Sequence, residues 1–452
     1  MKLFVTIAEE TPESAVGAIR RLTAGHDGVE VRVERFSSYD PAMFRAATAK
    51  PIILTKRGGA QSAAGVAPAL AAGIDLVDVE YGPELGWIRQ FRNRVVLSHH
   101  DFDGMPDVEP LLRDMRSHGC VHTKLAVTPR SLEDNFELLR HQRAGTTLIG
   151  MGERGLFSRI LAPFLGSELA FVSPSEDRVA APGQITLERA LAIYGDRREA
   201  WSAGDPARGS LAIFAIAGNP AGHSLSPSIH NPLFRSKVVR AVYTIASVES
   251  FGELEAPFLD DRIRGLSITA PFKEAAFAFA RKHGARIGEN AQACQAVNTL
   301  VNLNDGVLAD NTDVDGFTQI LSRLCGRDRK TVALVGAGGT ARAALVALDR
   351  AGMQIILYNR GEERGRGLAA SADAAFEPLE SLTRFDGEIV INTLPPGADV
   401  AMPLRPGMTL IEAAYGATRA HPAGVEIVDG LELLHAQAMR QHELFMKVFD
   451  ES

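Results

Sequence analysis

Short apolar runs rich in β-branched residues recur along the first half of the chain, with helical patterns between them. Eight such strand–helix units within about 200 residues predict a (β/α)8 TIM barrel, in which a closed parallel sheet is ringed by helices. In such a barrel the carboxyl ends of the strands converge on one face, where an active site forms. The predicted strands are Leu3–Ile7, Val29–Val33, Pro51–Thr55, Asp75–Val79, Arg94–Ser98, Val121–Val127, Thr146–Met151 and Leu169–Ser173.

Charged residues gather at the ends of these predicted strands. Their position predicts a polar site on the carboxyl face of the barrel. The alternation of Glu30, Arg32 and Glu34 also fits a solvated strand face or an internal ion-pair network, and a single histidine is more often a core or surface residue. The charged residues are Glu30, Arg32 and Glu34 on the second strand, Lys56 and Arg57 after the third, Glu80 after the fourth, and His99 and His100 at the end of the fifth.

Lys124 lies inside the sixth predicted strand, among apolar residues. Burial of an ammonium group is unfavourable unless it is paired or loses its charge, and the neutral amine is a nucleophile. We therefore identify Lys124 as a candidate for a Schiff base. Nearby, His118 and His122 have the spacing of a helical metal pair, but the intervening Gly119 and the strand that follows break the helical face, so no metal site is predicted.

The segment Thr331–Ala344, TVALVGAGGTARAA, predicts a strand, a tight turn and the start of a helix in the second half. Such a turn presents backbone N–H groups and a positive helix end to a pyrophosphate, and its glycines allow close approach. The spacing is G-x-G-G-x-A, and a glycine-rich turn without a ligand is the alternative. The predicted cofactor contacts are Gly336, Ala337, Gly338, Gly339, Thr340 and Ala341.

The next predicted strand, Gln354–Tyr358, distinguishes between the two nicotinamide cofactors. It is followed by Asn359, Arg360 and Arg364. An acidic residue at this strand end would bind the ribose hydroxyl of NAD, whereas arginines favour the additional phosphate of NADP. The sequence therefore predicts NADP. The alternative is that both arginines lie at a solvated helix start beside two glutamates.

Three further polar segments precede the nucleotide turn. Gly218–Asn231 is a hydroxyl-rich loop after a predicted strand, Leu211–Ala217, and it suits a polyol or a carboxylate, although a serine-capped helix start is also consistent. Lys273 ends another predicted strand, and Asp313 lies where a helix begins after the predicted strand Ala296–Val301. A lysine and an aspartate at such junctions can relay the proton that carbonyl reduction requires, or they can form an ordinary surface pair.

The composition restricts the classes of function. A hydrophobic content of 46% and a charged content of 23% are ordinary for a soluble globular protein, and 452 residues suggest two to three domains. The net charge of −7 argues against nucleic acid as the main partner, and no stretch has the length of a membrane span. Three scattered cysteines and no visible targeting signal predict a reduced, cytoplasmic protein.

The first half resembles type I 3-dehydroquinate dehydratase over roughly residues 1–200. The resemblance implies that Lys124 forms an imine with the substrate ketone, and that His100 removes the neighbouring proton and then assists the loss of water. It further implies that Glu30, Arg32, Arg57, Arg159 and Gln184 hold the carboxylate and the hydroxyls. The motifs are EVRVE (30–34), Lys56-Arg57, SHHDF (98–102), Lys124, FSR (157–159), LGSELAF (165–171) and APGQI (181–185).

Two positions depart from that family. Many of its members carry a carboxylate shortly after the arginine that matches Arg57, where this chain has Gly58-Gly59-Ala60-Gln61. The identity of the carboxylate that would pair with His100 is therefore left open. A serine often stands where this chain has Ala180, which leaves a substrate or loop contact open.

The second half resembles shikimate dehydrogenase over about residues 211–449. The motifs are GNPAGHSLSPSIHN (218–231), SITAPFK (267–273), AVNT (296–299), NTDVDGF (311–317), GAGGTARAA (336–344), Asn359-Arg360 with Arg364, and DGLELLHAQA (429–438). The resemblance implies hydride transfer between NADPH and a ring ketone, with Lys273 and Asp313 handling the proton. It implies that the substrate contacts are Ser224, Ser226, Thr269, Asn298, Asp313 and Gln437, with Tyr415 approaching the substrate.

Together the two resemblances predict a bifunctional enzyme of the shikimate pathway, because 3-dehydroshikimate is the product of one reaction and the substrate of the other. The alternatives are a quinate/shikimate dehydrogenase that uses NAD, which the arginines disfavour, and an inert metabolite sensor, which the presence of all four reacting groups disfavours. The predicted domains are a barrel at 1–205, a substrate-binding lobe at 211–318, a Rossmann lobe at 319–430 and a returning C-terminal helix at 431–452, with an exposed linker over 195–210.

Overall fold

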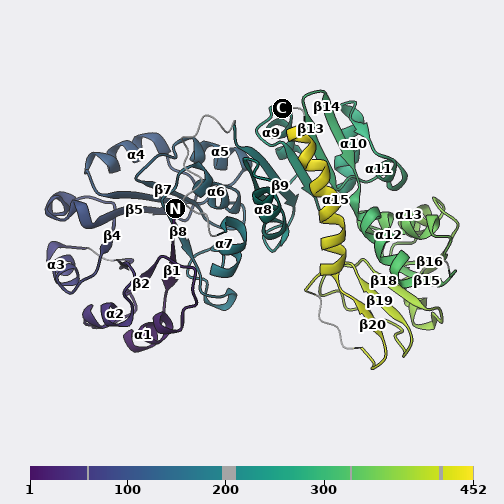
Figure 1. Ribbon diagram of the computed structural model, residues 1–452, viewed down its shortest axis with the longest axis horizontal. Coiled ribbons are helices and arrows are strands. Elements are labelled where there is room, and N and C mark those ends of the chain that lie inside the picture. The colour runs from purple at the N-terminus through teal and green to yellow at the C-terminus, as the bar shows by residue number, and fades with distance from the viewer. Residues whose placement is uncertain (59–60, 196–209, 326–327, 417–420, 451–452) are drawn as a thin grey trace. The chain divides into compact units, whose positions relative to one another are not determined.

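The computed structural model describes residues 1–58, 61–195, 210–325, 328–416 and 421–450 (Figure 1). These residues form two compact units. Unit 1 comprises Met1–Ala212 with Pro220–Val248, and unit 2 comprises Ile213–Asn219 with Glu249–Ser452. The predicted linker lies almost entirely outside the described residues, and the four domain ranges expected from the sequence stay a prediction.

Unit 1 contains a sheet of eight parallel strands in the order β7-β6-β5-β4-β3-β2-β1-β8, with helices around it (Figure 1). The predicted barrel is confirmed, and each strand coincides with one predicted run. The strands are β1 Lys2–Ile7, β2 Gly28–Arg32, β3 Ile52–Thr55, β4 Leu76–Glu80, β5 Val95–Asp101, β6 His122–Val127, β7 Thr146–Gly150 and β8 Leu169–Val172. The helices are α1 Pro12–Arg21, α2 Ala42–Ala47, α3 Ala63–Ala71, α4 Val108–Ser117, α5 Leu132–Arg140, α6 Leu156–Leu161 and α7 Leu187–Tyr194.

Strand β5 is longer at its carboxyl end than the sequence suggested. The apolar run ends near Ser98, but His99 and His100 continue the ladder opposite Leu125 and Ala126 of β6. Strand β4 likewise includes Glu80, which the sequence placed after the strand. Apolar periodicity underestimates these strands because polar residues at the active face of a barrel still make the main-chain hydrogen bonds of the sheet.

Residues 220–248 form a helix and a strand that belong to unit 1. Helix α8 spans Ser226–Ser236 with Pro227 in its first turn, and its N-cap is Leu225 without a side-chain hydrogen bond, so the helix begins at Ser226 but is not capped by a serine. Strand β10 spans Ala241–Ser247. The hydroxyl of Thr244 donates to the carbonyl of Phe157 in α6 at 3.1 Å, so this segment is bonded directly to the barrel.

The first strands of unit 2 are neighbours in the order β9-β11-β13-β14-β12 within a six-stranded mixed sheet. Two predicted placements are wrong by a few residues. Lys273 opens helix α10 and does not end a strand, because the chain turns at Pro271. Asn298 directly precedes strand β13, where its side chain bonds to helix α12. The elements are β9 Ala212–Gly218, α9 Gly252–Leu259, β11 Gly265–Ile268, α10 Lys273–Lys282, β12 Arg286–Ile287, α11 Glu289–Cys294, β13 Thr299–Leu303, β14 Gly306–Asp310 and α12 Thr312–Cys325.

The second sheet of unit 2 is parallel, with the order β17-β16-β15-β18-β19-β20. Counted from β15, this is the 3-2-1-4-5-6 order of a Rossmann fold, so the predicted dinucleotide fold is confirmed. The C-terminal helix packs against α12 and β13. The elements are β15 Thr331–Val335, α13 Gly339–Arg350, β16 Gln354–Asn359, α14 Glu362–Ala369, β17 Ala374–Pro378, β18 Ile389–Asn392, β19 Thr409–Glu412, β20 Glu426–Val428 and α15 Gly430–Asp450.

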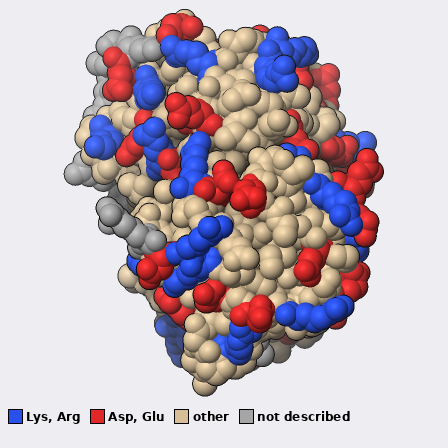
Figure 2. Space-filling model, turned by 90° about the vertical axis from the view of Figure 1, so that its right-hand side faces the viewer, with Lys and Arg blue, Asp and Glu red and all other residues tan. Residues whose placement is uncertain are grey.

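None of the described helices combines the length and apolar composition that crossing a bilayer requires. On the face of the molecule drawn in Figure 2, basic and acidic side chains are interspersed, without an extended area of one sign. Within the described residues, no three His, Cys, Asp or Glu side chains are grouped in a way that could hold a metal ion. The ring of His122 lies buried, with Nε2 at 2.7 Å from the hydroxyl of Thr147.

Candidate active sites

The barrel encloses a cavity of about 270 Å³ at the carboxyl ends of its strands. Because these ends converge, side chains from seven different strands and from the loops reach one space. The structure brings together all seven residues predicted for the first site. The cavity is lined by Glu30, Arg32, Arg57, His100, Lys124, Arg159 and Gln184, and also by Thr6, Gly58, Glu80, Phe102, Ala126, Ile149, Met151, Phe171, Ala180 and Ala181.

Lys124 lies on β6 and is only 4% exposed. Its Nζ is 3.3 Å from Oδ2 of Asp78 and 3.5 Å from Oε1 of Glu30. It also lies 3.9 Å from the centre of the Phe171 ring. Two carboxylates and an aromatic face thus hold the amine in place on the cavity wall.

Glu30 on β2 is fixed by two hydroxyl donors. Thr6 donates to Oε2 at 2.8 Å and Thr55 donates to Oε1 at 2.9 Å. The amide of Gln184 donates to the Thr6 hydroxyl at 2.9 Å, so these two predicted substrate contacts belong to one network. Although burial opposes ionisation, Lys124 and Arg57 hold the pKa of Glu30 below its ordinary value.

Arg57 links the two carboxylates of β4. Its guanidinium bonds to both oxygens of Asp78, at 2.9 and 3.1 Å, and to Oε2 of Glu80 at 2.7 Å. Asp78 is fully buried, and although burial opposes ionisation, Arg57 and Lys124 hold its pKa well below the usual range. Asp78 was missed at the level of sequence. Its only signal there is a carboxylate between the valines of an otherwise apolar strand.

His100 on β5 is paired with Glu80 of the neighbouring strand. Its Nδ1 lies 2.9 Å from Oε2 of Glu80, and its backbone N–H donates to Oε1 at 2.9 Å. An ionised carboxylate only accepts, so Nδ1 carries the proton and Nε2 keeps its lone pair. Burial lowers the pKa of His100, and the Glu80 hydrogen bond opposes this effect while Lys124 and Arg57 reinforce it. His100 is therefore suited to act as a base near neutral pH.

The carboxylate partner that the sequence left open is Glu80. Gln61, in the segment that departs from the family pattern, does not bond to His100. Its Nε2 donates to the Asp78 carbonyl at 2.9 Å, and its Oε1 accepts from the Glu80 backbone N–H at 2.8 Å. Gln61 thus clamps the end of β4, from which Glu80 reaches the histidine.

Arg32 and Arg159 both line this cavity. Arg32 is paired with Glu34 through an Nη2–Oε1 distance of 2.5 Å. Arg159 donates from Nε to the Gly150 carbonyl at 3.0 Å, and burial lowers its pKa to about 10. The backbone N–H of Ala180 donates to Oε1 of Gln184 at 3.0 Å, so this position orients the glutamine through its main chain.

The residues predicted for the second site fall in both units. Ser224 and Ser226 are buried in unit 1, with their hydroxyls 3.1 Å apart. The remaining predicted residues lie in unit 2.

Lys273 and Asp313 form the ion pair that the sequence predicted. Nζ of Lys273 donates to Oδ2 of Asp313 at 2.5 Å and to the hydroxyl of Thr340 at 3.0 Å. Nδ2 of Asn298 donates to the other Asp313 oxygen at 2.9 Å. Thr312 was not predicted, and it connects this group to α15, because its hydroxyl lies 3.0 Å from Nδ2 of Asn298 and 3.1 Å from Oε1 of Gln437.

Thr269 and Tyr415 are two further predicted substrate residues, and their backbones contact other parts of unit 2. Thr269 is half-buried after β11, and its backbone N–H donates to the Ala217 carbonyl at 2.9 Å. Tyr415 is half-buried, and its backbone lies against Gly430 at the start of α15, where a Cβ would come within 2.3 Å of the Tyr415 nitrogen. Gly430 therefore permits a close approach between this tyrosine and the helix that carries Gln437.

The turn after β15 has the geometry that a dinucleotide requires. Gly336 has a φ of 108°, and a Cβ there would lie 2.4 Å from the Thr393 hydroxyl. Gly338 caps α13 without a side-chain hydrogen bond, and a Cβ on it would meet nothing within 4 Å. The first N–H groups of the helix are thus uncapped beside open space, as a pyrophosphate needs. Ala337 and Ala341 are buried beneath the turn.

The proton relay and the nucleotide turn meet at Gly339. A Cβ there would lie 2.9 Å from Cδ of Lys273, so glycine is needed for the lysine to reach Thr340 and Asp313. At the end of β16, Asn359 is half-buried, and Arg360 and Arg364 are exposed. Arg364 is paired with Glu274 at 2.6 Å, which positions it over the start of α10.

Comparisons with known proteins agree with both halves of this arrangement. The family model described as Type I 3-dehydroquinase matches residues 3–199, and the model described as Shikimate dehydrogenase substrate binding domain matches residues 216–300. The bifunctional 3-dehydroquinate dehydratase/shikimate dehydrogenase, chloroplastic, of Arabidopsis thaliana is 28% identical over 422 residues, which are 83% of this chain and 68% of the relative.

Two bacterial relatives extend this result. The shikimate biosynthesis protein AroDE of Chlamydia pneumoniae is 28% identical over 377 residues, and the match covers 79% of this chain and 74% of the relative. The shikimate dehydrogenase (NADP(+)) of Syntrophobacter fumaroxidans is 32% identical over 252 residues, which are 52% of this chain and 87% of the relative. The chain therefore belongs to the shikimate dehydrogenase family, and it carries a type I 3-dehydroquinase domain ahead of that part.

Proposed function

We propose that this chain dehydrates 3-dehydroquinate to 3-dehydroshikimate in the barrel cavity and then reduces 3-dehydroshikimate to shikimate with NADPH. The observation that carries the proposal is the placement of a buried amine, Lys124, and a carboxylate-paired imidazole, His100, on the wall of one cavity of about 270 Å³. Conversion of 3-dehydroquinate to shikimate by the full chain, with consumption of NADPH, tests both activities together.

In the dehydration, the Lys124 amine adds to the substrate ketone and water leaves, which forms a protonated imine. Nε2 of His100 removes a proton from the carbon next to the imine, and the imine accepts the electron pair. The electrons then return to expel the neighbouring hydroxyl, which leaves as water with the proton from His100. Addition of water to the imine releases 3-dehydroshikimate and restores the Lys124 amine.

The surrounding charges support this sequence of steps. Glu30 and Asp78 lie within 3.5 Å of the Lys124 nitrogen, so they stabilise the positive charge that the imine carries. Arg32 and Arg159 are cations on the cavity wall and suit the substrate carboxylate. Gln184 is oriented by Thr6 and suits a substrate hydroxyl.

Glu80 orients His100 in this proposal, and its replacement tests that role. We expect Glu80→Gln to lower kcat for dehydration roughly tenfold to a hundredfold, because the base remains but loses its carboxylate partner. The negative charge of Glu80 raises the pKa of His100 against burial, so its removal lowers that pKa further. The acidic limb of the kcat/KM profile should therefore move to lower pH.

Stopped assays of dehydration over roughly pH 4 to 9 would measure this shift, because this range brackets the ordinary pKa of histidine. Glu84→Gln is the matched control, because Glu84 is exposed just beyond β4. An unchanged rate and profile in Glu80→Gln would contradict the assigned role.

In the reduction, bound NADPH supplies the hydride to the ring ketone. The Lys273 ammonium, held by Asp313 and Thr340, donates the proton to the developing alkoxide. Asn298 fixes the second oxygen of Asp313, so the carboxylate keeps one orientation towards the lysine. Ser224, Ser226, Thr269, Gln437 and Tyr415 bind the carboxylate and hydroxyls of the substrate in this proposal.

Arg360 is the principal determinant of NADP preference in this proposal, because it is exposed at the end of β16, whereas Arg364 is already paired with Glu274. We expect Arg360→Ala to raise KM for NADP⁺ roughly tenfold through loss of one charged hydrogen-bonding partner, and to leave KM for NAD⁺ unchanged. Steady-state oxidation of shikimate with each cofactor measures this difference.

Arg366→Ala provides the control for cofactor preference, because Arg366 is exposed on α14, the helix that follows Arg360. A wild-type preference for NADH would overturn the NADP assignment and favour the NAD-dependent quinate/shikimate dehydrogenase.

The presence of Lys124, His100, Lys273 and Asp313 in paired geometry argues against an inert sensor. We also propose a reducing compartment such as the cytoplasm, because Cys120, Cys294 and Cys325 are all free thiols.

A further inference from the structure

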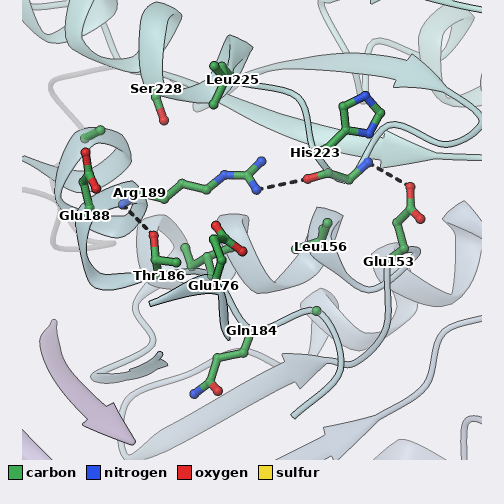
Figure 3. Close-up of a pocket in the computed structure, with 14 residues that line it drawn as sticks. Glu153, Leu156, Glu176, Gln184, Thr186, Glu188, Arg189, His223, Leu225 and Ser228 are labelled. Atoms are coloured by element: carbon green, nitrogen blue, oxygen red, sulfur yellow. Dashed lines mark hydrogen bonds between the residues drawn. The ribbon is translucent and has the colours of Figure 1, made fainter. Parts of the chain in front are cut away.

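The loop before α8 carries Ser224 and Ser226, and it is held by side chains of the barrel. The loop follows Pro220, and together with residues up to Val248 it belongs to the same compact unit as the barrel. Two barrel residues bond to its main chain. They are Glu153, between β7 and α6, and Arg189, in the first turn of α7 (Figure 3).

Arg189 makes the more extensive contact. Its Nη1 donates to the Gly222 carbonyl at 3.0 Å, and its Nη2 donates to the Ser224 carbonyl at 2.7 Å. A guanidinium is a rigid fork, so two bonds to carbonyls two residues apart fix both the position and the direction of the peptide between them. That peptide leads directly into the Ser224 side chain.

Glu153 holds the opposite side of the same loop. Its Oε1 accepts from the backbone N–H groups of Ala221 and Gly222, each at 2.8 Å, and from the hydroxyl of Ser247 at 2.7 Å. A Cβ on Gly222 would lie only 2.8 Å from Cγ of Glu153, so the absence of a side chain at Gly222 lets the loop come this close to Glu153. The Glu153 carboxylate thus accepts hydrogen bonds from N–H groups of the loop, and the Arg189 guanidinium donates hydrogen bonds to its carbonyl oxygens.

Packing alone does not fix this part of the loop. Gly222 and His223 border an open cavity of about 680 Å³, whose other walls include Gln184 and the start of α7 (Figure 3). On this side the loop therefore has space in which to move. Glu153 and Arg189 bond to the loop here, in addition to the bond from the Ala221 N–H to the Ser247 hydroxyl and the bond from the Ser224 N–H to the Ala221 carbonyl. The hydroxyls of Ser224 and Ser226 bond to each other beyond them.

We propose that Arg189 and Glu153, which lie in the dehydratase barrel, are positioning residues for the substrate site of the reductase. They set the main chain from Gly222 to Ser224, and through it they place the two serine hydroxyls for the carboxylate of shikimate or 3-dehydroshikimate. The affinity of the reductase for its substrate therefore depends on residues of the barrel. This inference rests on the proposed substrate role of the two serines.

The test is the oxidation of shikimate by NADP⁺ with the full chain. Arg189→Ala should raise KM for shikimate roughly tenfold, because charged hydrogen bonds that order the loop are lost. KM for NADP⁺ and the dehydration of 3-dehydroquinate should stay at wild-type values. Glu153→Ala should give a smaller increase, since Glu153 is exposed and its bonds compete with water.

Conservative variants separate positioning from simple loss of structure. Arg189→Lys keeps the charge and one donor, so it should recover part of the affinity for shikimate, and Glu153→Gln keeps an oxygen acceptor and should do the same. The alanine at position 189 retains the backbone N–H that Thr186 caps, so α7 should persist. Glu188→Ala is the control, because Glu188 is exposed next to Arg189 and lines the same cavity.

An unchanged KM for shikimate in Arg189→Ala would overturn the proposal. A parallel loss of dehydration and shikimate oxidation would also overturn it, because Arg189 would then only stabilise the barrel. Failure of the proposed function is a separate result, since the wild-type chain would then not oxidise shikimate at all.

Discussion

Replacement of Lys124 by methionine is expected to abolish dehydration of 3-dehydroquinate and to leave shikimate oxidation at the wild-type rate. Methionine has nearly the length of lysine but no amine, so an imine cannot form. We expect kcat for dehydration to fall by roughly 10⁴-fold or more, the scale that loss of a covalent nucleophile produces. The reductase should be unaffected because the cavity that Lys124 lines contains none of the residues proposed for the reduction.

This variant also leaves Glu30 and Asp78 without the cation that lies 3.5 and 3.3 Å from them. Both carboxylates are buried, so the variant should be less stable than the wild type. Thermal unfolding followed by circular dichroism would measure that cost, and assays should be made well below the midpoint. The retained reductase activity serves as an internal control for a folded chain.

Borohydride reduction in the presence of 3-dehydroquinate provides the direct chemical test of the imine. The wild-type chain should gain a stable adduct, and peptide mapping should place it on Lys124. The Lys124→Met chain should gain none. An adduct at another lysine, or full dehydratase activity in the variant, would contradict the proposed mechanism.

The complementary change, Lys273→Ala, is expected to abolish reduction of 3-dehydroshikimate while dehydration continues. Lys273 is the donor that contacts Asp313 at 2.5 Å, and its loss removes the proton source next to the ketone. General acid catalysis is worth roughly 10² to 10⁴ in rate, and we expect a fall of that size in kcat. Asp313→Asn should lower kcat as well, because the lysine loses its orienting charge.

Two measurements strengthen this second prediction. Lys282→Ala is the matched control, because Lys282 is exposed at the other end of α10. Binding of NADP⁺ to Lys273→Ala, measured by calorimetry, should stay within a few-fold of the wild type, since the hydrogen bond of Lys273 at the turn goes to the Thr340 hydroxyl. Wild-type reduction by Lys273→Ala would exclude the lysine as the proton donor.

The fold was largely predictable because its signals are local. Each barrel strand is a short apolar run between helical patterns, and the glycine turn after β15 marks the Rossmann sheet. The ends of β4 and β5 were not predictable, because Glu80 and His100 break the apolar pattern while they continue the ladder. Lys273 was placed in a strand for a related reason, since the chain turns at Pro271 without a change in hydropathy.

Most members of the candidate sites were predictable, although Asp78 and Thr312 were missed, and the Lys273–Asp313 pair was predicted while the partner of His100 was not. The resemblance supplied Lys124 and His100, but the partner of His100 depends on how adjacent strands are aligned. Glu80 lies opposite Ser98 in the parallel register, and only this alignment brings its carboxylate to His100. The bonds from Arg189 to the serine loop join residues more than 30 positions apart, for which the sequence carries no pattern.

The central claim is that one chain carries out both reactions in succession, and a single coupled assay tests it most directly. The full chain is supplied with 3-dehydroquinate and NADPH, and shikimate is measured together with the loss of NADPH. We expect one shikimate formed and one NADPH consumed for each 3-dehydroquinate, and neither in the Lys124→Met chain. Reduction of added 3-dehydroshikimate without any consumption of NADPH from 3-dehydroquinate would contradict it.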